Sequence, residues 1–398
     1  MSRVYIHNVA NLVTGDLGAE PIRDTTLVLE DGVVAAIGGD AGDPDVVIDA
    51  KGLDVIPGLV DGHVHPTFGE YTPAQDAIGW IRNYLHGGTT TMVSAGELHI
   101  PGLAFDELDP RLVKSIAFTS RATTGRYRPS GMKLHAGTVM LVTGMTEADF
   151  DEMAEVGVQH LKYIFYDWNR ADDDEPERYR RWAHERGMLI KIHSGGVSRS
   201  GSSRVAGYEI VMSANPDIVA HISGGPIPMP DDEIVGIVDD LHGSAIEICS
   251  SMNYRATIVT VNHLAQRGEL DRLVLGTDTP GGTGVIPRGM LRNICYLSAV
   301  CGLDPVTAIA AGTSNVARAH GVAGGRIAVG ETADLLLTGP IRGSQAQNTL
   351  EAFALGDVPG LSVVVVDGEP VIAPRTDQLP PPKDLAEIEV LRTRTPRW

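Results

Sequence analysis

The stretch from Val55 to Pro66 reads VIPGLVDGHVHP and joins an apolar run to two closely spaced histidines. Side chains alternate between the two faces of a strand, so His63 and His65 are expected on the same face, with Val64 turned away. Neutral imidazole is a common ligand of zinc and of other transition metals. The pattern predicts half of a metal site at the end of a buried strand. The alternative is a pair of histidines that only make hydrogen bonds in a core.

Strand-like and helix-like segments alternate from this stretch to about residue 299. The strand-like runs are residues 55–64, 89–94, 132–142, 158–164, 188–192, 217–220, 244–248 and 272–276. Eight strands separated by helices predict an α/β protein built on a (β/α)8 TIM barrel. A doubly wound sheet is the alternative fold, but polar residues at strand ends all around the set fit a barrel better.

Short strands bounded by turns flank the predicted barrel on both sides in the sequence. Asp31-Gly32 and Asp367-Gly368 are two-residue hairpin signals, one on each side. We therefore predict that the two ends of the chain fold together. Residues 1–54 and 321–375 form the two parts of one small β-sandwich domain, residues 55–320 form the barrel, and residues 376–398 form a loosely attached C-terminal tail.

The composition limits the partners of the protein. A formal charge of -19 at pH 7 and a pI near 5.0 disfavour nucleic acid and anionic membranes, because their phosphates would be repelled. Three cysteines without C-x-x-C spacing indicate a reducing compartment rather than a disulfide framework. No apolar run approaches the roughly 18 residues that a membrane span needs, and the N-terminus lacks the apolar core of a signal peptide. We expect a soluble cytoplasmic protein with a small-molecule substrate.

Three further residues with metal-binding chemistry lie at the ends of predicted strands. His193 and His221 each end an apolar run and precede a glycine-rich turn, and Asp278 follows the last predicted strand. Barrel enzymes carry their chemistry at the C-terminal ends of the strands. We therefore expect these residues to meet His63 and His65 in one metal centre.

Lys162 lies inside the apolar strand predicted at residues 158–164. A lysine that faces the interior is costly unless it is paired or modified. Carbon dioxide converts a neutral lysine amine to a carbamate, which is a carboxylate able to bridge two metal ions. The simpler interpretation is that Lys162 pairs with a carboxylate or reaches the solvent.

The sequence resembles the amidohydrolase superfamily over most of its length. The likeness is carried by Val33–Ile37, PGLVDGHVH at 57–65, Lys162, His193, His221, Asp278, GETADLLL at 330–337 and VVDGEPV at 365–371. Within the superfamily it is most similar to enamidases and other cyclic amidohydrolases, on the segments at 85–96, 221–226 and 276–287. The resemblance implies a TIM barrel with a small β-sandwich domain, and a homo-oligomer that is a dimer or a tetramer.

The resemblance also implies two divalent metal ions, either both zinc or with iron or manganese at one site. The ligands it implies are His63, His65 and Asp278 for one ion, and His193 and His221 for the other. The sequence departs from enamidases at the bridge between the ions. That family uses a glutamate near the end of strand 4, and the matching run here offers Lys162 instead. Lys162 resembles the carboxylated lysine of dihydroorotases, hydantoinases and prolidase-like members.

The predicted protein is a binuclear metal-dependent hydrolase of a C–N bond other than a peptide bond, in a small cyclic amide. A hydroxide that bridges the metals attacks the carbonyl carbon, and Asp278 passes the proton to the leaving nitrogen. A prolidase-like or N-acyl amino acid hydrolase would use the same centre and is the alternative. A mononuclear deaminase is less favoured because it needs no bridging lysine, and a non-catalytic scaffold because no ligand is missing.

A cyclic amide that carries a carboxylate needs a cation and an apolar wall in its binding site. Arg288 is the preferred cation, because it is predicted at a helix N-terminus that adds a favourable field. A surface salt bridge is the alternative for this arginine. The other candidates for substrate contacts are His135, Tyr163, Tyr166, Trp168 and Arg199.

Overall fold

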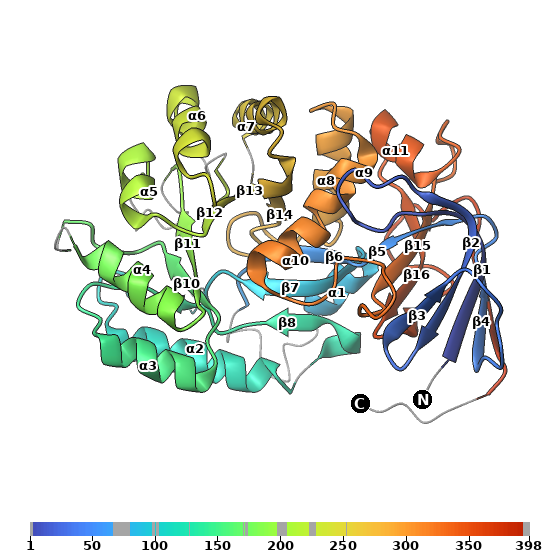
Figure 1. Ribbon diagram of the computed structural model, residues 1–398, viewed down its shortest axis with the longest axis horizontal. Coiled ribbons are helices and arrows are strands. Elements are labelled where there is room, and N and C mark those ends of the chain that lie inside the picture. Colours follow the sequence, from blue (N-terminus) through green and yellow to red (C-terminus); the bar gives the residue numbers. More distant parts are fainter. Residues whose placement is uncertain are drawn as a thin grey trace.

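The structure is a computed structural model with two parts, a nine-stranded sheet and a set of parallel strands surrounded by helices (Figure 1). It describes residues 3–66, 80–97, 100, 103–126, 128–169, 171, 174–196, 205–222, 228–251 and 253–392. Arg199 therefore lies outside the described residues. Among the helices of these ranges, none combines the length and the apolar character that crossing a membrane requires.

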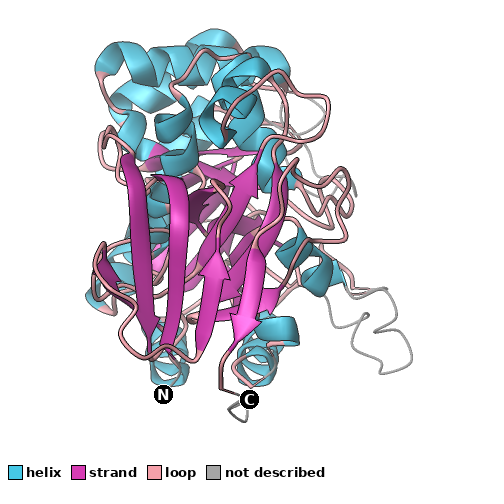
Figure 2. Ribbon diagram, turned by 90° about the vertical axis from the view of Figure 1, so that its right-hand side faces the viewer, coloured by secondary structure: helices cyan, strands magenta, loops and turns pink. Residues whose placement is uncertain are grey.

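Strands from both ends of the sequence form the nine-stranded sheet (Figure 1), which faces the viewer in Figure 2. Its strands are β1 (Arg3–Leu12), β2 (Ile22–Glu30), β3 (Val33–Ile37), β4 (Val46–Asp49), β5 (Asp54–Pro57), β15 (Leu335–Gly339), β16 (Gly360–Val366), β17 (Glu369–Ile372) and β18 (Glu387–Val390). The order is β17-β16-β15-β5-β1-β2-β3, and β4 pairs with both β1 and β18. The antiparallel pairing of β5 with β15 joins the two ends of the chain.

The central residues form two parallel sheets, with the order β14-β13-β12-β11-β10-β9 in one and β6-β7-β8 in the other. The strands are β6 (Leu59–Val64), β7 (Thr89–Ser94), β8 (Lys133–His135), β9 (Val139–Met140), β10 (His160–Tyr163), β11 (Leu189–His193), β12 (Ile218–Ala220), β13 (Ala245–Cys249) and β14 (Leu273–Gly276). The predicted α/β class is therefore confirmed. In the described residues the strands make these two hydrogen-bonded sheets and not one continuous closed sheet.

Helices lie on the outside of the parallel strands (Figure 1). They are α1 (Trp80–His86), α2 (Pro110–Thr124), α3 (Glu147–Val156), α4 (Glu175–Glu185), α5 (Tyr208–Ala214), α6 (Asp231–Asp240), α7 (Tyr254–Arg267), α8 (Gly289–Ala299), α9 (Pro305–Ala311), α10 (Ser314–His320) and α11 (Thr349–Leu355). The amphipathic α3 shows why such segments become helices. Thr146 and Asp149 form a capping box at its start, and Gly157 ends it in the left-handed conformation that glycine adopts without a steric penalty.

The first and last parallel strands are joined by hydrogen bonds between the end of β6 and the residues that follow β14. Asp278 N donates to His63 O at 2.8 Å, and His65 N donates to Thr279 O at 2.7 Å. On the other side, the single strand predicted at residues 132–142 is two short strands, β8 and β9. Gly137 lies between them with φ of 94°, against the backbone of α2, so the strand changes direction there.

The strands β15 and β16 separate two hydrophobic cores. Leu335 and Leu337 pack into the core of the nine-stranded sheet, whereas Leu336 between them packs into the core around the parallel strands. Val363 and Val364 in β16 divide between the two cores in the same way. Because successive side chains of a strand point to opposite faces, a strand buried on both faces is apolar throughout. This explains the unbroken apolar runs of β15 and β16.

A cluster of ion pairs around the buried Asp334 also connects the two parts. Lys133 Nζ in β8 lies 2.6 Å from Asp334 Oδ2 and 2.7 Å from Asp367 Oδ1. Arg128 donates to the same Asp367 at 2.6 Å. The side chain of Asp334 is fully buried, so Lys133 supplies the charge that compensates it.

The prediction of a loosely attached tail is wrong for part of the C-terminal segment. Residues Glu387–Val390 form β18, which pairs antiparallel with β4. Ala386, just before it, is buried in the core of the nine-stranded sheet. Hydrogen bonds to β4 at the edge of the sheet hold this segment, and Ile388 packs against the same core between the charged Glu387 and Glu389.

Candidate metal centre

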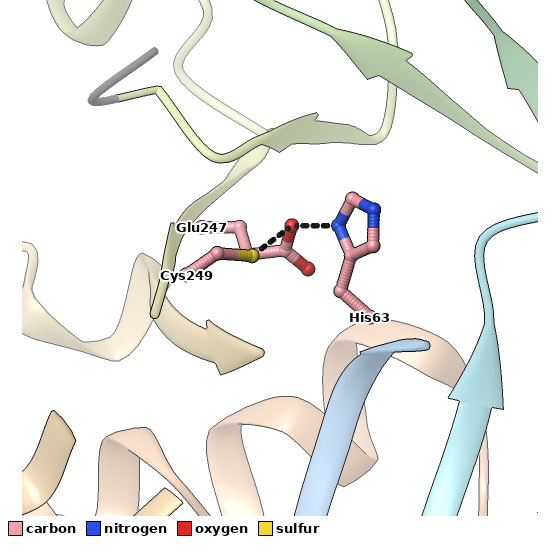
Figure 3. A group of neighbouring side chains, drawn as sticks. All are labelled: His63, Glu247 and Cys249. Carbon is pink, nitrogen blue, oxygen red and sulfur yellow. Dashed lines mark hydrogen bonds and ion pairs between the residues drawn. The ribbon is translucent and has the colours of Figure 1, made fainter. Parts of the chain in front are cut away.

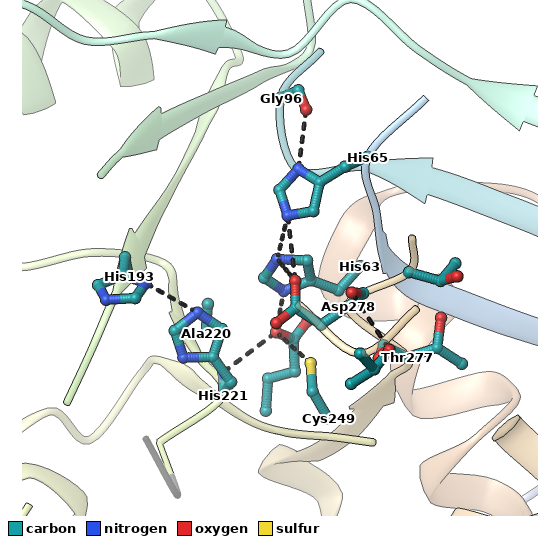
Figure 4. A network of polar contacts seen from close by, with 12 residues as sticks. His63, His65, Gly96, His193, Ala220, His221, Cys249, Thr277 and Asp278 are labelled. Atoms are coloured by element: carbon teal, nitrogen blue, oxygen red, sulfur yellow. Dashed lines mark hydrogen bonds and ion pairs between the residues drawn. The ribbon is translucent and has the colours of Figure 1, made fainter. Parts of the chain in front are cut away.

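His63, His65 and Asp278 converge at the ends of β6 and β14 (Figure 4). The Nε2 atoms of the two histidines are 3.2 Å apart. Asp278 Oδ1 lies 3.1 Å from Nε2 of His65 and 3.5 Å from Nε2 of His63. The predicted alternation of the His-x-His pair thus brings two imidazole nitrogens and one carboxylate oxygen to a common point.

Asp61 fixes the backbone on which this group depends. It is fully buried in β6, and its Oδ1 accepts from His63 N at 3.1 Å and from Thr277 N at 2.9 Å. Its Oδ2 accepts from the Thr277 hydroxyl. Burial raises the pKa of Asp61 to about 7, and the bonds from Thr277 and His63 oppose that rise. Asp61 therefore ties the first parallel strand to the last one directly beside Asp278.

Asp278 is held in an unusual conformation. Its φ is 59°, in the left-handed region that non-glycine residues seldom adopt. The carbonyl of Asp278 accepts from Gly282 N at 2.8 Å, and a Cβ at Gly282 would lie 1.8 Å from Asp278 Oδ2. Burial raises the pKa of the Asp278 carboxyl, but the neighbouring His63 and His65 outweigh it and hold that pKa below its usual value. Asp278 is thus a carboxylate aimed at the two histidines.

His193 and His221 form a second pair next to the first. His193 Nδ1 lies 3.0 Å from His221 Nε2, while His193 Nε2 contacts Gly196 O at 2.6 Å. The ring centroids of His63 and His221 are 5.3 Å apart, so the two pairs are adjacent. Burial lowers the pKa of His193 to about 4 and that of His221 to about 3. Both rings are therefore neutral at pH 7, which is the form that binds metals.

Lys162 faces the same region from β10. It is completely buried, and in the described part of the chain its Nζ has no hydrogen-bond partner. Burial lowers the pKa of Lys162 to about 7, with the positive charge of Lys191 acting in the same direction. Among the described residues Lys162 neither pairs with a carboxylate nor reaches the solvent, which were the two simpler interpretations. An unpaired ammonium is costly at such a place, so the group is ready for modification or for a ligand.

These residues fit the pair of divalent ions that the resemblance implies. Neutral imidazoles and carboxylates are ligands for zinc, iron and manganese. Nitrogens of two histidines face each other at 3.2 Å in one pair and 3.0 Å in the other, an arrangement that a shared cation would stabilise. His221 Nδ1 and Lys162 Nζ are buried without a partner among the described atoms. His63, His65 and Asp278 also offer ligand atoms within 4.8 Å of one another.

Three buried polar residues near this centre were not predicted. Glu247 in β13 accepts from His63 Nδ1 at 2.6 Å and lies next to Cys249 (Figure 3). Lys191 in β11 donates to the second oxygen of Glu247 at 2.6 Å. Glu97 follows β7, and its Oε1 accepts from Gly137 N at 2.9 Å. A charged residue inside an apolar strand was the available signal for Glu247 and Lys191, as it was for Lys162.

The aromatic candidates for substrate contacts form one cluster. The ring centroids of Tyr163 and Tyr166 are 4.9 Å apart, and that of Trp168 lies 5.3 Å from Tyr163. The hydroxyl of Tyr166 donates to Glu175 at 2.8 Å, and this hydrogen bond restrains the orientation of the Tyr166 ring. A small cavity next to the cluster is lined by Tyr163, Trp168 and His193 among others. The cluster therefore borders the second histidine pair.

Arg288 has a packing role in the structure. Its guanidinium donates to the carbonyls of Leu379, Val358 and Pro359 at 2.9, 3.1 and 2.8 Å. These bonds connect the start of α8 to the segments before β16 and after β17, so three backbone carbonyls occupy donors that the predicted carboxylate-binding role requires. His135 is half-buried in β8, and burial lowers its pKa.

The family model described as "Amidohydrolase family" matches residues 55–371. Enamidase from Eubacterium barkeri is 38% identical over 393 residues, which cover 98% of this chain and 100% of that protein. Adenine deaminase from Ruegeria pomeroyi is 26% identical and is matched over 81% of this chain but only 52% of its own length. The resemblance to amidohydrolases, and to enamidase among them, is confirmed.

Solved structures give the same result. A crystal structure of enamidase, 38% identical, matches with a TM-score of 0.88 over 98% of this chain and 100% of its own. A putative prolidase from Bifidobacterium longum, 20% identical, shares the fold with a TM-score of 0.65 over 95% and 96% of the two chains. The family match begins just before the first histidine pair and ends in β17, and the enamidase aligns over almost the whole length, so this protein is a member of the amidohydrolase family.

Proposed function

We propose that this protein hydrolyses the C–N bond of a small cyclic amide at a centre that holds two divalent metal ions. The observation that supports it is the convergence of two neutral histidine pairs, one carboxylate and one unpaired lysine in a buried site. The substrate class follows from the similarity to enamidase over nearly the full chain. We further propose that the two parallel sheets are the wall of one (β/α)8 barrel, and that the nine-stranded sheet is its β-sandwich domain.

In this proposal His63, His65 and Asp278 would hold one ion, and His193 and His221 would hold the other. The ions supply Lewis acidity and water with a lowered pKa when they are bound. Asp278 then takes a proton from the attacking water and passes it to the amide nitrogen that leaves. Its Oδ1 is suited to this transfer because it lies at the point where the first histidine pair converges. Tyr163 and Trp168 give the ring an apolar wall next to His193.

We propose that Lys162 is carboxylated and bridges the two ions. The free amine attacks the carbon of CO2, a new N–C bond forms, and one proton is released to the solvent. This reaction requires a neutral amine, and burial lowers the pKa of Lys162 to about 7, so a large fraction of the amine is neutral at that pH. The product is a carboxylate in a place where the chain offers no glutamate from the same strand.

A substrate panel tests the function. Metal-loaded protein is assayed with a six-membered cyclic enamide, the saturated lactam of the same ring, an N-acyl amino acid, a proline dipeptide and adenine. We expect ring opening of the cyclic amides, with about two metal ions per chain by elemental analysis. Faster turnover of the dipeptide or acyl amino acid favours a prolidase-like enzyme, and release of ammonia from adenine with one ion per chain favours a deaminase.

A second experiment tests the bridge. In ¹³C-bicarbonate buffer the wild type should give a carbamate resonance that is absent from Lys162→Ala. That variant should also lose activity and bind fewer metal ions. Lys51→Ala is the matched control, because Lys51 is a partly exposed lysine in the nine-stranded sheet region, where it pairs with Asp49 and Glu387. A wild type with two ions and no carbamate signal would show that the bridge is something else.

A further inference from the structure

Glu247 is a buried carboxylate that none of the proposed steps uses. Its side chain is fully buried in β13, and its two oxygens have different partners. Oε1 lies 2.6 Å from His63 Nδ1, and Oε2 lies 2.6 Å from Lys191 Nζ. A charge at such depth is costly to bury unless it is paired, and Figure 3 shows the contact of Glu247 with His63.

The contact with His63 determines which ring nitrogen carries the proton. A carboxylate only accepts hydrogen bonds, so at 2.6 Å the proton must be on Nδ1 of His63. The lone pair is then on Nε2, which is the atom that faces His65 and Asp278 (Figure 4). A carboxylate behind a ligating histidine fixes the tautomer and the ring orientation, and it makes the imidazole a better metal ligand.

Lys191 compensates the charge of Glu247 and also contacts the backbone of β6, the strand that carries His63. Its Nζ donates to Gly62 O at 2.7 Å, directly before His63 in the chain. Lys191 also precedes His193 by two residues in β11, so both side chains are on one face of that strand. Glu247 Oε1 in turn accepts from the backbone N of His221 at 3.2 Å. The pair therefore contacts elements that bear both halves of the metal centre.

His63, Glu247 and Cys249 are themselves a group whose ligand atoms lie within 4.8 Å, which suggests a metal site of their own. Two observations disfavour it. The Lys191 ammonium already occupies one oxygen of Glu247, so a cation there would be repelled. Cys249 donates its thiol proton to Glu247 at 3.3 Å, whereas a ligand would be a thiolate.

We propose that Glu247 and Lys191 are a pair of positioning residues that preset the Nδ1–H tautomer of His63 and so increase the metal affinity of the centre. Glu247 orients the ring, and Lys191 holds the second oxygen of Glu247 and anchors β6 through Gly62 O. This inference rests on the proposed metal centre. Loss of such a partner typically lowers metal affinity by about 10- to 100-fold.

Metal affinity tests the proposal without an activity assay. Chelator competition gives the zinc dissociation constant of the wild type, Glu247→Gln, Glu247→Gln with Lys191→Met, and Cys249→Ala. We expect weaker binding by about 10- to 100-fold in Glu247→Gln and wild-type affinity in Cys249→Ala. The double variant removes both buried charges, so its melting temperature should recover towards the wild type while its metal affinity stays low. If the pair were merely structural, the melting temperature and the metal affinity of the double variant would both return towards the wild-type values.

The tautomer can be measured on the wild type. In metal-free protein with ¹⁵N-labelled histidine, the ring nitrogens of His63 should show Nδ1 protonated and Nε2 free, with assignment from the spectrum of His63→Gln. A protonated Nε2, or a Glu247→Gln variant with wild-type affinity, overturns the proposal while leaving the metal centre intact. A loss of affinity in Cys249→Ala also overturns it, in favour of a separate site. A wild type that binds no zinc refutes the metal centre itself, and this inference with it.

Discussion

Replacing Gly282 with alanine is expected to displace the carboxylate of Asp278. A Cβ built at Gly282 would lie 1.8 Å from Asp278 Oδ2, 2.2 Å from its Cγ and 2.7 Å from its Oδ1. An ordinary contact begins at 3.4 Å, so the nearest oxygen must move by 3.4 − 1.8 = 1.6 Å. Oδ1 belongs to the same rigid carboxylate and would itself lie 2.7 Å from the new Cβ, so its 3.1 Å contact with Nε2 of His65 is disturbed as well.

The expected effect on turnover follows from that displacement. A misplacement of about 1 Å in a reacting group costs about 100-fold in rate. We therefore expect kcat on a cyclic amide to fall by at least about 100-fold, which corresponds to about 2.7 kcal/mol at the transition state. Elemental analysis should show weaker retention of metal after dialysis, because Asp278 is also a proposed ligand.

Gly243→Ala is the matched control. Gly243 has no positive φ, and nothing lies within 4 Å of the Cβ that the substitution adds. This variant should match the wild type in kcat, metal content and melting temperature, and circular dichroism should show that both variants are folded. If Gly282→Ala keeps kcat and metal content within twofold of the wild type, Asp278 does not act from the position described, and the proton transfer must be assigned to another residue.

Three further predictions concern charge. Asp278→Asn leaves an uncharged amide oxygen in place, unlike the displaced carboxylate of Gly282→Ala, so it should keep most of the bound metal; without a base it should lower kcat by about 100-fold or more, measured by steady-state turnover beside elemental analysis. Lys133→Met should lower the free energy of unfolding by about 3–5 kcal/mol in denaturant titrations, because it leaves the buried Asp334 uncompensated; Arg392→Ala, which breaks an exposed pair with Asp43, should cost less than about 1 kcal/mol. Burial raises the pKa of Glu97 to about 7, so the unfolded chain binds fewer protons than the folded one between pH 4.5 and 7 and stability is lost as pH rises through that window. Asp61, whose pKa burial also raises to about 7, adds a slope of the same sign in this window, so Glu97→Gln should make the slope shallower rather than flat. The variant should also raise the free energy of unfolding at pH 8 by up to about 3 kcal/mol, and an unchanged slope would contradict the shifted pKa of Glu97.

Local sequence signals predicted the parallel strands well. The strands β6, β7, β10 and β14 fall inside predicted runs, because a short apolar segment bounded by turns is typical of a buried strand in an α/β protein. The break between β8 and β9 was missed because it depends on α2 packing against Gly137, a contact between separate elements. The run of apolar residues alone did not contain that information.

The same distinction applies to the site. The His-x-His pair and the histidines at strand ends were recognisable because a histidine at the end of an apolar run is visible in the local sequence. Glu247 contacts a histidine of another strand, and Arg288 contacts backbone carbonyls far along the chain. No local sequence pattern predicts such partners. Glu247 was missed and Arg288 was given a role that its carbonyl contacts do not support, for the same physical reason.

The pairing of β5 with β15 has a consequence for synthesis of the chain on the ribosome. The strand β5 ends at Pro57 and its partner begins at Leu335, so about 280 residues must be translated between them. At roughly 5–20 residues per second, this takes on the order of tens of seconds. During that time the N-terminal strands present an unpaired apolar edge, which is the kind of surface that recruits chaperones or other nascent chains. The last strands to emerge are therefore the ones that end this exposure.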